Sequence, residues 1–214
     1  MFTGLIEHLG EVGGLNAVAG GSRLSVSPTP PINDLEIGES IAVDGVCLTV
    51  EPESASENLI FFLTEETLSK TTIGKFGNGQ KVNLERAMAG MDRFGGHLVM
   101  GHVDGVGKIA RLDRQGEGWL LEVECTPDFM AFVAPKGSVA VDGISLTPVD
   151  VTKTSFTVAL IPHTQTHTSL SGKGAGAAVN IEADMIARYV HQYMARLGEA
   201  GGVDDALLKR AGFQ

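Results

Sequence analysis

Short runs of apolar and β-branched residues, interrupted by turn residues, make up most of the chain. Ser40–Val43 and Ser138–Val141 are two such runs, and each stops at an Asp-Gly pair, a strong signal for a tight hairpin turn. The apolar pattern resumes directly after each turn, and Leu59–Leu63 and Phe156–Ile161 predict further strands. The chain is therefore expected to be mostly β.

Helical patterns are confined to three places. The Thr-rich segments Glu65–Ile73 and Thr164–Leu170 each predict a short helix that leads into glycine. Beyond Asp184, apolar residues fall at positions 185, 186, 189, 190, 193, 194 and 197, which is helical spacing with one apolar stripe, and Asp184 suits the N-cap. The pattern leaves open whether this stripe packs on another subunit or on the chain's own barrel.

Three blocks of sequence recur in the same order at a nearly constant offset. The first pairs Ile41–Thr49 with Val139–Thr147, and six of its nine positions are identical. The other two blocks are Leu63–Glu85 with Leu160–Glu182, and Gly4–Glu7 with Gly101–Asp104. The offset is 98 residues for the first block and 97 for the others, which indicates an internal duplication.

About six strands in each copy, with no long helix between them, predict an all-β fold. We expect two tandem, homologous, six-stranded Greek-key barrels followed by a C-terminal α-helix. The predicted N-terminal barrel covers 1–96 and the C-terminal barrel 97–183, and the boundary lies near Ala87–Gly96, where Gly, Met and charged residues cluster. An oligomerisation helix is expected at 184–197, followed by a mobile tail at 198–214.

The net charge and the cysteine content argue against some classes of partner and location for this protein. The formal net charge of −10 argues against a nucleic-acid partner, because phosphates demand a basic surface. Neither a signal peptide nor a run of about 18 apolar residues is visible, so no membrane span is expected. Cys47 and Cys125 are the only cysteines, which suits a reducing cytoplasm better than a disulfide framework.

Three motifs together resemble those of one family. They are Met1-Phe-Thr-Gly-Leu-Ile-Glu7, the two Asp-Gly-x-[Cys/Ser]-Leu-Thr blocks, and Gly95-Gly-His-Leu-Val-Met-Gly-His102. This ordered set resembles riboflavin synthase over the chain to about residue 197. The resemblance implies that two molecules of 6,7-dimethyl-8-ribityllumazine become riboflavin and 5-amino-6-(D-ribitylamino)uracil by four-carbon transfer, without a metal or an organic cofactor.

The resemblance also implies an assembly and two half-sites. Family members form homotrimers through their C-terminal helices, associate with lumazine synthase, and pair the N-terminal barrel of one subunit with the C-terminal barrel of its neighbour. The implied N-terminal half-site is Gly4, Leu5, Ile6, Cys47, Leu48, Thr49, Phe62, Leu63, Thr64, Glu65, Glu66 and Thr67. The implied C-terminal half-site is Gly101, His102, Val103, Lys136, Ser145, Leu146, Thr147, Ala159, Leu160, Ile161, Pro162, His163 and Thr164. Glu66, Thr67, His163 and Thr164 are expected at the ribityl hydroxyls.

Donor and acceptor must be treated differently, so catalytic residues are expected where the two copies differ, at His102, Ser145, Lys136 and Asp184. With the residues considered beside them, the catalytic candidates are His102, Ser145, Thr147, Asp184, Ser40 and Cys47.

His102 suits proton transfer near neutral pH, although it could be a plain turn histidine. Ser145 and Thr147 could polarise a water or the ring, or simply follow strand alternation. Cys47 could add to C7 of the substrate or be a small core thiol that lines the pocket. Asp184 could orient Ser40 across the interface or act only as an N-cap.

Some features stay outside this pattern. Pro148 cannot donate to a β-ladder, which predicts an edge or a bulge there. His163 stands where the first copy has Glu66, so the ribityl contacts are expected to differ between the pockets. His97 is either structural or close to the site, with no role assigned.

Two other functions are alternatives to the enzyme. One is a lumazine- or flavin-binding protein without catalysis. The other, a flavin-dependent reductase, would need a βαβ nucleotide-binding unit with a Gly-rich turn, and the sequence has none.

Overall fold

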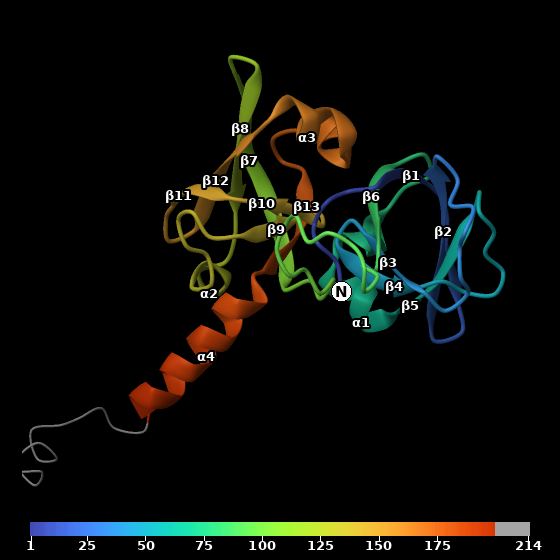
Figure 1. Ribbon diagram of the computed structural model, residues 1–214, viewed down its shortest axis with the longest axis horizontal. Helices are drawn as coiled ribbons and strands as arrows, with labels where there is room; N and C mark the ends of the chain where they lie inside the picture. The colour runs from blue at the N-terminus through green and yellow to red at the C-terminus, as the bar shows by residue number, and fades with distance from the viewer. Residues whose placement is uncertain (200–214) are drawn as a thin grey trace, which may run out of the picture.

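Two curled β-sheets stand side by side, and one long helix projects from the second of them (Figure 1). The computed structural model describes residues 1–199, so nearly all of the predicted tail at 198–214 lies outside the described residues. Among these residues, no helix is long and apolar enough to cross a membrane.

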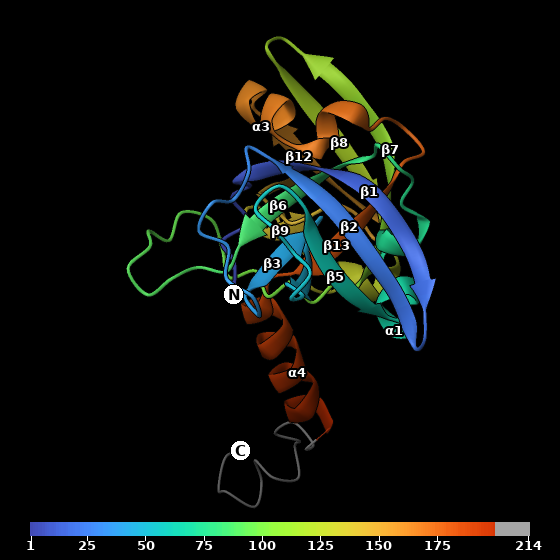
Figure 2. The same ribbon diagram turned by 90° about the vertical axis from the view of Figure 1, so that its right-hand side faces the viewer.

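The first sheet has six strands in the order β4-β3-β6-β1-β2-β5. Their bounds are β1 His8–Val18, β2 Gly21–Thr29, β3 Ser40–Val43, β4 Val46–Thr49, β5 Leu59–Thr64 and β6 Lys81–Arg86. The long strands β1, β2 and β5 curl side by side across one face (Figure 2). An antiparallel bridge between Val50 and Phe61 joins the two edges of this sheet, which closes the barrel.

The second sheet repeats this order and adds one strand, as β10-β9-β13-β7-β8-β12-β11. Its strands are β7 Gly105–Gln115, β8 Gly118–Glu124, β9 Val139–Val141, β10 Ile144–Leu146, β11 Pro148–Val151, β12 Ser155–Leu160 and β13 Ala178–Ala183. Thus the duplicated, mostly β fold is confirmed, and the seventh strand is the difference. Pro148 opens this edge strand, and the register shifts between Pro148 and Asp150, as predicted.

Short helices cover one end of each barrel at the predicted places. They are α1 Glu65–Lys70 and the 3-10 turn η1 Thr72–Lys75 in the first copy, and α3 Pro162–His167 and η2 Ser169–Gly172 in the second. The second copy has one further helical turn, α2 Pro127–Met130.

The projecting helix is α4, Met185–Glu199 (Figure 1). Its apolar residues Ile186, Tyr189, Val190, Tyr193 and Met194 are each more than half exposed. The chain's own barrel therefore leaves this stripe uncovered. This excludes the alternative that the stripe packs on its own barrel. Arg188 fixes the base of the helix through an ion pair of 2.7 Å with Asp104.

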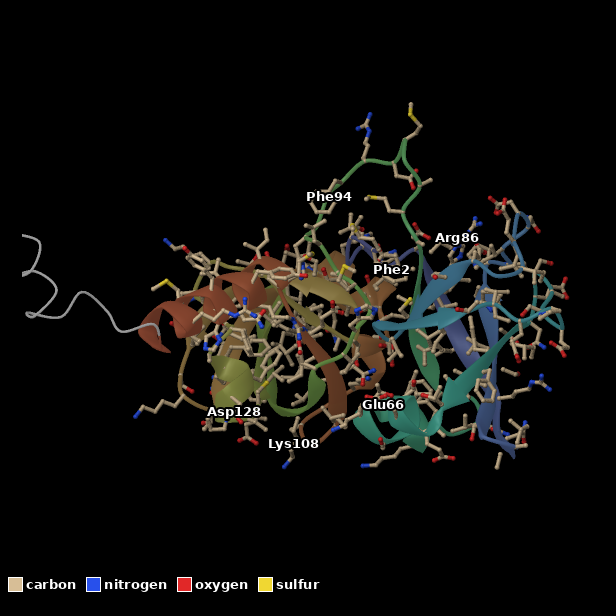
Figure 3. The ribbon with its side chains drawn as sticks, turned by 90° about the horizontal axis from the view of Figure 1, so that it is seen from below. Phe2, Glu66, Arg86, Phe94, Lys108 and Asp128 are labelled. Carbon is tan, nitrogen blue, oxygen red and sulfur yellow. The ribbon has the colours of Figure 1, made fainter. Side chains whose placement is uncertain are left out.

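Each barrel has its own apolar core, and a third cluster joins them. This cluster contains Phe2, Ala42, Val99 and Ala140, all buried. Phe2 pairs with Val99 as a short antiparallel bridge, and it lies between the two barrels (Figure 3). The two copies therefore meet through their N-terminal segments. The loop that carries Phe94 projects away from both barrels (Figure 3).

Candidate functional site

A hollow of about 520 Å³ opens in the N-terminal barrel, a size typical of small-molecule pockets. Strands β4 and β5 and helix α1 form much of its wall. The predicted residues that line it are Cys47, Leu48, Thr49, Phe62, Thr64 and Thr67. Phe62 is 39% exposed although it is a large apolar side chain, so the hollow offers a flat apolar surface next to hydroxyl groups.

The segment at Gly101 contacts the N-terminal barrel as well as the barrel of its own copy. The backbone N–H of Cys47 donates to the carbonyl of Gly101 at 2.9 Å. A Cβ atom on Gly101 would lie 2.5 Å from the Cβ of Cys47, and its φ of +76° also favours glycine. Val103 packs against the N-terminal core. Gly101 and Val103 therefore contact the N-terminal barrel, whereas the sequence predicted them, with His102, in the C-terminal half-site.

The segment at Gly4 makes the reciprocal exchange. The backbone N–H of Ser145 donates to the carbonyl of Gly4 at 2.8 Å, and a Cβ on Gly4 would lie 2.6 Å from that of Ser145. Ile6 packs against the C-terminal core. Gly4 and Ile6 therefore contact the C-terminal barrel, whereas the sequence predicted them, with Leu5, in the N-terminal half-site. The first segment of each copy therefore contacts the barrel of the other copy. Because the two segments are equivalent, this exchange leaves the repeat alignment unchanged.

Two buried carboxylates hold these exchanged segments. Glu85 accepts hydrogen bonds from the backbone N–H groups of Thr3 and Gly4 at 2.6 and 2.9 Å, and Glu182 does the same for Met100 and Gly101 at 2.7 and 2.9 Å. Burial raises the pKa of both carboxyls, and the donated hydrogen bonds oppose that shift. Sequence reasoning missed this role, although the equal offset of the two glutamates was visible.

His97 contacts the candidate Ser145. Its Nδ1 atom lies 2.7 Å from Ser145 Oγ, within hydrogen-bond distance. His97 is 7% exposed, and its Nε2 atom is buried without a hydrogen-bond partner among the described residues. Burial lowers the pKa of His97 below its ordinary 6.5, while the charge of Asp184 opposes this shift. A neutral imidazole beside a hydroxyl is a base in contact with a nucleophile.

The other catalytic candidates occupy less connected positions. His102 is exposed and lines a hollow at the base of α4 together with Arg188 and Tyr189. Ser40 begins β3, where it pairs with Thr49, and is partly buried. Thr147 is exposed between β10 and β11. Their catalytic roles stay predictions.

Asp184 is the N-cap of α4, as predicted. Its carboxylate accepts a hydrogen bond from the backbone N–H of Ile186 at 2.9 Å, and its carbonyl accepts one from Arg188. Because its charge also acts on His97, the same carboxylate links the base of α4 to the C-terminal half-site.

Lys136 occupies a strained position that its counterpart fills with glycine. Its φ is +62°, and Gly38 has a φ of +89° at the same place in the first copy. Both residues donate a backbone hydrogen bond to the strand that closes their barrel, Lys136 to Pro148 at 2.8 Å and Gly38 to Val50 at 3.0 Å. A lysine held in the left-handed region next to a candidate site suggests a functional constraint.

The stretches that end β5 and β12 reach the site in equivalent ways. Each runs from a strand into a short helix, at Thr64 in the first copy and Ile161 in the second. Ile161 is 62% exposed, so it presents an apolar surface as Phe62 does. The His163 ring stacks on His167 with centroids 4.1 Å apart, whereas Glu66 stands at the matching place in the first copy.

Comparisons with known proteins agree with this duplicated architecture. A family model described as the lumazine binding domain matches the chain twice, at residues 3–87 and 100–184. Solved structures of LumP are similar in fold. The complex with riboflavin has a TM-score of 0.78 and the complex with 6,7-dimethyl-8-(1'-D-ribityl) lumazine one of 0.76, each at 20% identity over 86% of this chain and 99% of the other.

Curated relatives are more similar in sequence. The riboflavin synthase of Actinobacillus pleuropneumoniae is 39% identical over 194 residues, which is 91% of this chain and 90% of the relative. That of Bacillus subtilis (strain 168) is 38% identical over 93% of this chain and 92% of its own length. That of Mycobacterium tuberculosis (strain ATCC 25618 / H37Rv) is 38% identical over 92% of this chain and its whole length. With two lumazine-binding domain matches in one chain, the protein belongs to the riboflavin synthase family.

Proposed function

We propose that the protein transfers a four-carbon unit between two molecules of 6,7-dimethyl-8-ribityllumazine, giving riboflavin and 5-amino-6-(D-ribitylamino)uracil. Two lumazines contain the same atoms as these two products, so the reaction requires no external oxidant. The observation that carries the proposal is the pair of equivalent half-sites that differ in their reactive groups. Cys47 contacts the exchanged segment at Gly101 in one of them, and Ser145 contacts the exchanged segment at Gly4 and His97 in the other.

The symmetric part of the site suits two copies of one substrate. In each copy a strand runs into a short helix next to an exposed apolar side chain, Phe62 in the first and Ile161 in the second. Phe62 and Ile161 would pack on the ring systems, and Thr67 and Thr164 would bond the ribityl hydroxyls. Fixing both reactants in this way lowers the entropic barrier of a bimolecular step.

The asymmetric part of the site suits nucleophilic activation. The reaction needs a proton removed from the 7-methyl group of one lumazine and a nucleophile added at C7 of the other. Ser145 Oγ adds at C7 of the lumazine in the C-terminal half-site, and its proton passes to Nδ1 of His97. Lys136 and Thr147 would then contact the polar edge of the same ring. His102 follows Gly101 and lines the hollow at the base of α4, where its catalytic role stays a prediction.

The two half-sites of the complete active centre come from neighbouring subunits of a homotrimer. The exposed apolar stripe of α4 supports this assembly, since an uncovered stripe of this kind marks an interaction surface. Leu5 and Ile161 are at least half exposed beside the C-terminal half-site, which leaves that half-site open to a partner. Division into barrels at 1–96 and 97–183, a cytoplasmic location and an association with lumazine synthase complete the proposal.

Incubation of the purified protein with the lumazine alone tests the activity. Riboflavin should accumulate with one pyrimidine product for every two lumazines consumed, under anaerobic conditions and without added cofactor. If the lumazine binds and remains unchanged, the chain is a lumazine-binding protein without catalysis and the proposal is wrong.

A further inference from the structure

Two buried carboxylates and one lysine meet between the barrels. Asp44 and Asp142 are both 0% exposed, and each begins the Asp-Gly pair of its hairpin turn. The Nζ atom of Lys173 lies 2.6 Å from Asp142 Oδ2 and 3.6 Å from Asp44 Oδ2. Lys173 follows η2 and its side chain is 12% exposed. Two carboxylates thus share one ammonium group, and we call this cluster the interbarrel lock.

A reciprocal hydrogen-bond network surrounds the interbarrel lock. The side-chain amide of Asn83 donates to the carbonyl of Asp142 at 2.9 Å, and that of Asn180 donates to the carbonyl of Asp44 at 2.8 Å. Each aspartate carboxylate also accepts the backbone N–H of the asparagine in its own barrel, at 2.7 and 2.8 Å. Each turn is therefore hydrogen-bonded to both barrels, and the contacts of one turn match those of the other.

Lys173 breaks this symmetry. At the offset of 97 residues its counterpart is Phe76, which is buried in the N-terminal core. The first copy therefore supplies no second ammonium group, and the lock carries one negative charge in excess unless a proton is bound. Burying an uncompensated charge is costly, so the site favours a retained proton.

The electrostatics of Asp44 agree with a retained proton. Burial, followed by the charge of Asp142, raises the pKa of Asp44 to about 7. The charged groups that act on Asp44 are Asp142 from the opposite turn and Lys173, while its contacts from β6 and η2 are the uncharged Asn83 and Ser169. Burial also raises the pKa of Asp142, against the opposing charge of Lys173.

The two turns carry the reactive residues of the two half-sites. Cys47 follows Asp44 by three positions in β4, and Ser145 follows Asp142 by three positions in β10. The turns touch, since a Cβ atom on Gly45 would lie 2.6 Å from the backbone nitrogen of Gly143. A cleft of about 420 Å³ opens over the lock and includes Lys173, Thr72 and Ser169 in its wall, which gives protons a path from solvent.

We propose that Lys173 is a positioning residue, and that its ammonium together with one proton on the Asp44–Asp142 pair holds the strands of Cys47 and Ser145 in a fixed relation. Loss of that proton as pH rises loosens the contact between the barrels. The lock itself is independent of the proposed function, whereas its effect on turnover rests on that function.

The sign of the pH dependence follows from the carboxyls. An aspartate in the unfolded chain has a pKa near 3.8, so between about pH 4 and pH 7 the folded state binds more protons than the unfolded state. The free energy of unfolding contributed by the lock therefore falls as pH rises through this window. Asp44→Asn cannot ionise and keeps an oxygen for the bonds from Asn83 and Ser169, so it should remove most of this fall.

Denaturant unfolding of the full chain between pH 5 and pH 8 tests the lock without substrate. Relative to Asp44→Asn, the unfolding equilibrium constant of the wild type should rise by at least about tenfold across this range. Lys173→Met should make the unfolding equilibrium constant rise more steeply with pH. Lys173→Arg should have the wild-type pH profile. Lys81→Met is the matched control, because Lys81 lines the same cleft but pairs with the exposed Glu11, and it should leave the profile unchanged.

Parallel pH profiles for the wild type and Asp44→Asn would overturn the lock, even if Lys173→Met fails to fold. The role in turnover has its own readout. Lys173→Met should lower kcat at pH 8 by about tenfold with a small change in KM, and Lys173→Arg should recover it. An unchanged kcat in Lys173→Met together with a steeper pH profile of unfolding would remove the positioning role and leave only a structural lock. No riboflavin from the wild type would reject the function and leave the unfolding result intact.

Discussion

The Nδ1 atom of His97 lies 2.7 Å from the Oγ atom of Ser145. The N-terminal half-site has Cys47 at the place of Ser145. The duplicated fold thus places unlike reactive groups, Cys47 and Ser145, at equivalent positions of its two copies. Catalysis between two identical substrates requires this kind of difference.

His97→Gln should lower kcat by about 100-fold, because general base catalysis typically contributes this much. The substituted side chain keeps polar atoms in the buried site, so KM should change little. Steady-state riboflavin formation measures both constants. His8→Gln serves as the control, since His8 lies in β1 of the other barrel, and it should stay within about twofold of the wild type. Equal kcat in the wild type and His97→Gln would remove His97 from the mechanism.

The pH profile of kcat/KM should report the same imidazole. Burial holds the pKa of His97 below 6.5, so its basic form persists at neutral pH and is lost only as pH falls below 6.5. We expect an acid limb below pH 6.5 in the wild type and its absence in His97→Gln. An acid limb centred above pH 7, or one that survives in His97→Gln, would contradict this assignment.

Gly101→Ala should disturb the N-terminal half-site although Gly101 opens the second repeat. Its new Cβ would collide with Cys47, so the rate at which the Cys47 thiol is alkylated should change by several-fold. Bound riboflavin should also protect this thiol less from alkylation. Gly4→Ala is the control, because its Cβ meets Ser145 instead. Cys125 should react slowly throughout, since burial raises its pKa to about 12. Mass spectrometry of the labelled peptides separates the two thiols. A change in Cys47 reactivity in Gly4→Ala alone would contradict the exchange of segments.

Tyr193→Asp should dissociate the assembly, because it places a charge in the exposed apolar stripe of α4. Sedimentation should show a smaller species, and riboflavin formation should fall by at least about tenfold. Gln192→Asp adds the same charge to the neighbouring position and should preserve both. An intact oligomer in Tyr193→Asp would show that α4 does not hold the subunits together.

Much of the fold could be predicted from the sequence because its signals are local. The Asp-Gly turns are an example, since Asp44 and Asp142 have φ of 42° and 47° and each is followed by a glycine with positive φ. The spacing of apolar residues after Asp184 likewise predicted α4. The long hairpins β1–β2 and β7–β8 were missed, because a bulge at Val12–Gly14 and another at Ile109–Arg111 interrupt the alternation of apolar residues.

The candidate site could be predicted only in part, because its key contacts are between distant segments. The sequence predicts Gly4 and Gly101 in the half-sites of their own copies, whereas each also contacts the barrel of the other copy. The repeat offers no signal here, since an exchange of equivalent segments leaves every sequence match unchanged. The contact of His97 with Ser145 spans 48 residues and has no local pattern.

Mixing two inactive variants tests the shared active centre most directly. Ser145→Ala disables the C-terminal half-site, and Gly101→Ala disables the N-terminal one. If each centre joins half-sites from neighbouring subunits, trimers reassembled from equal amounts should contain intact centres at roughly a quarter of their interfaces, and riboflavin formation should return to that extent. If the mixture stays as inactive as its two components while mixed trimers are shown to form, the two half-sites do not meet across subunits.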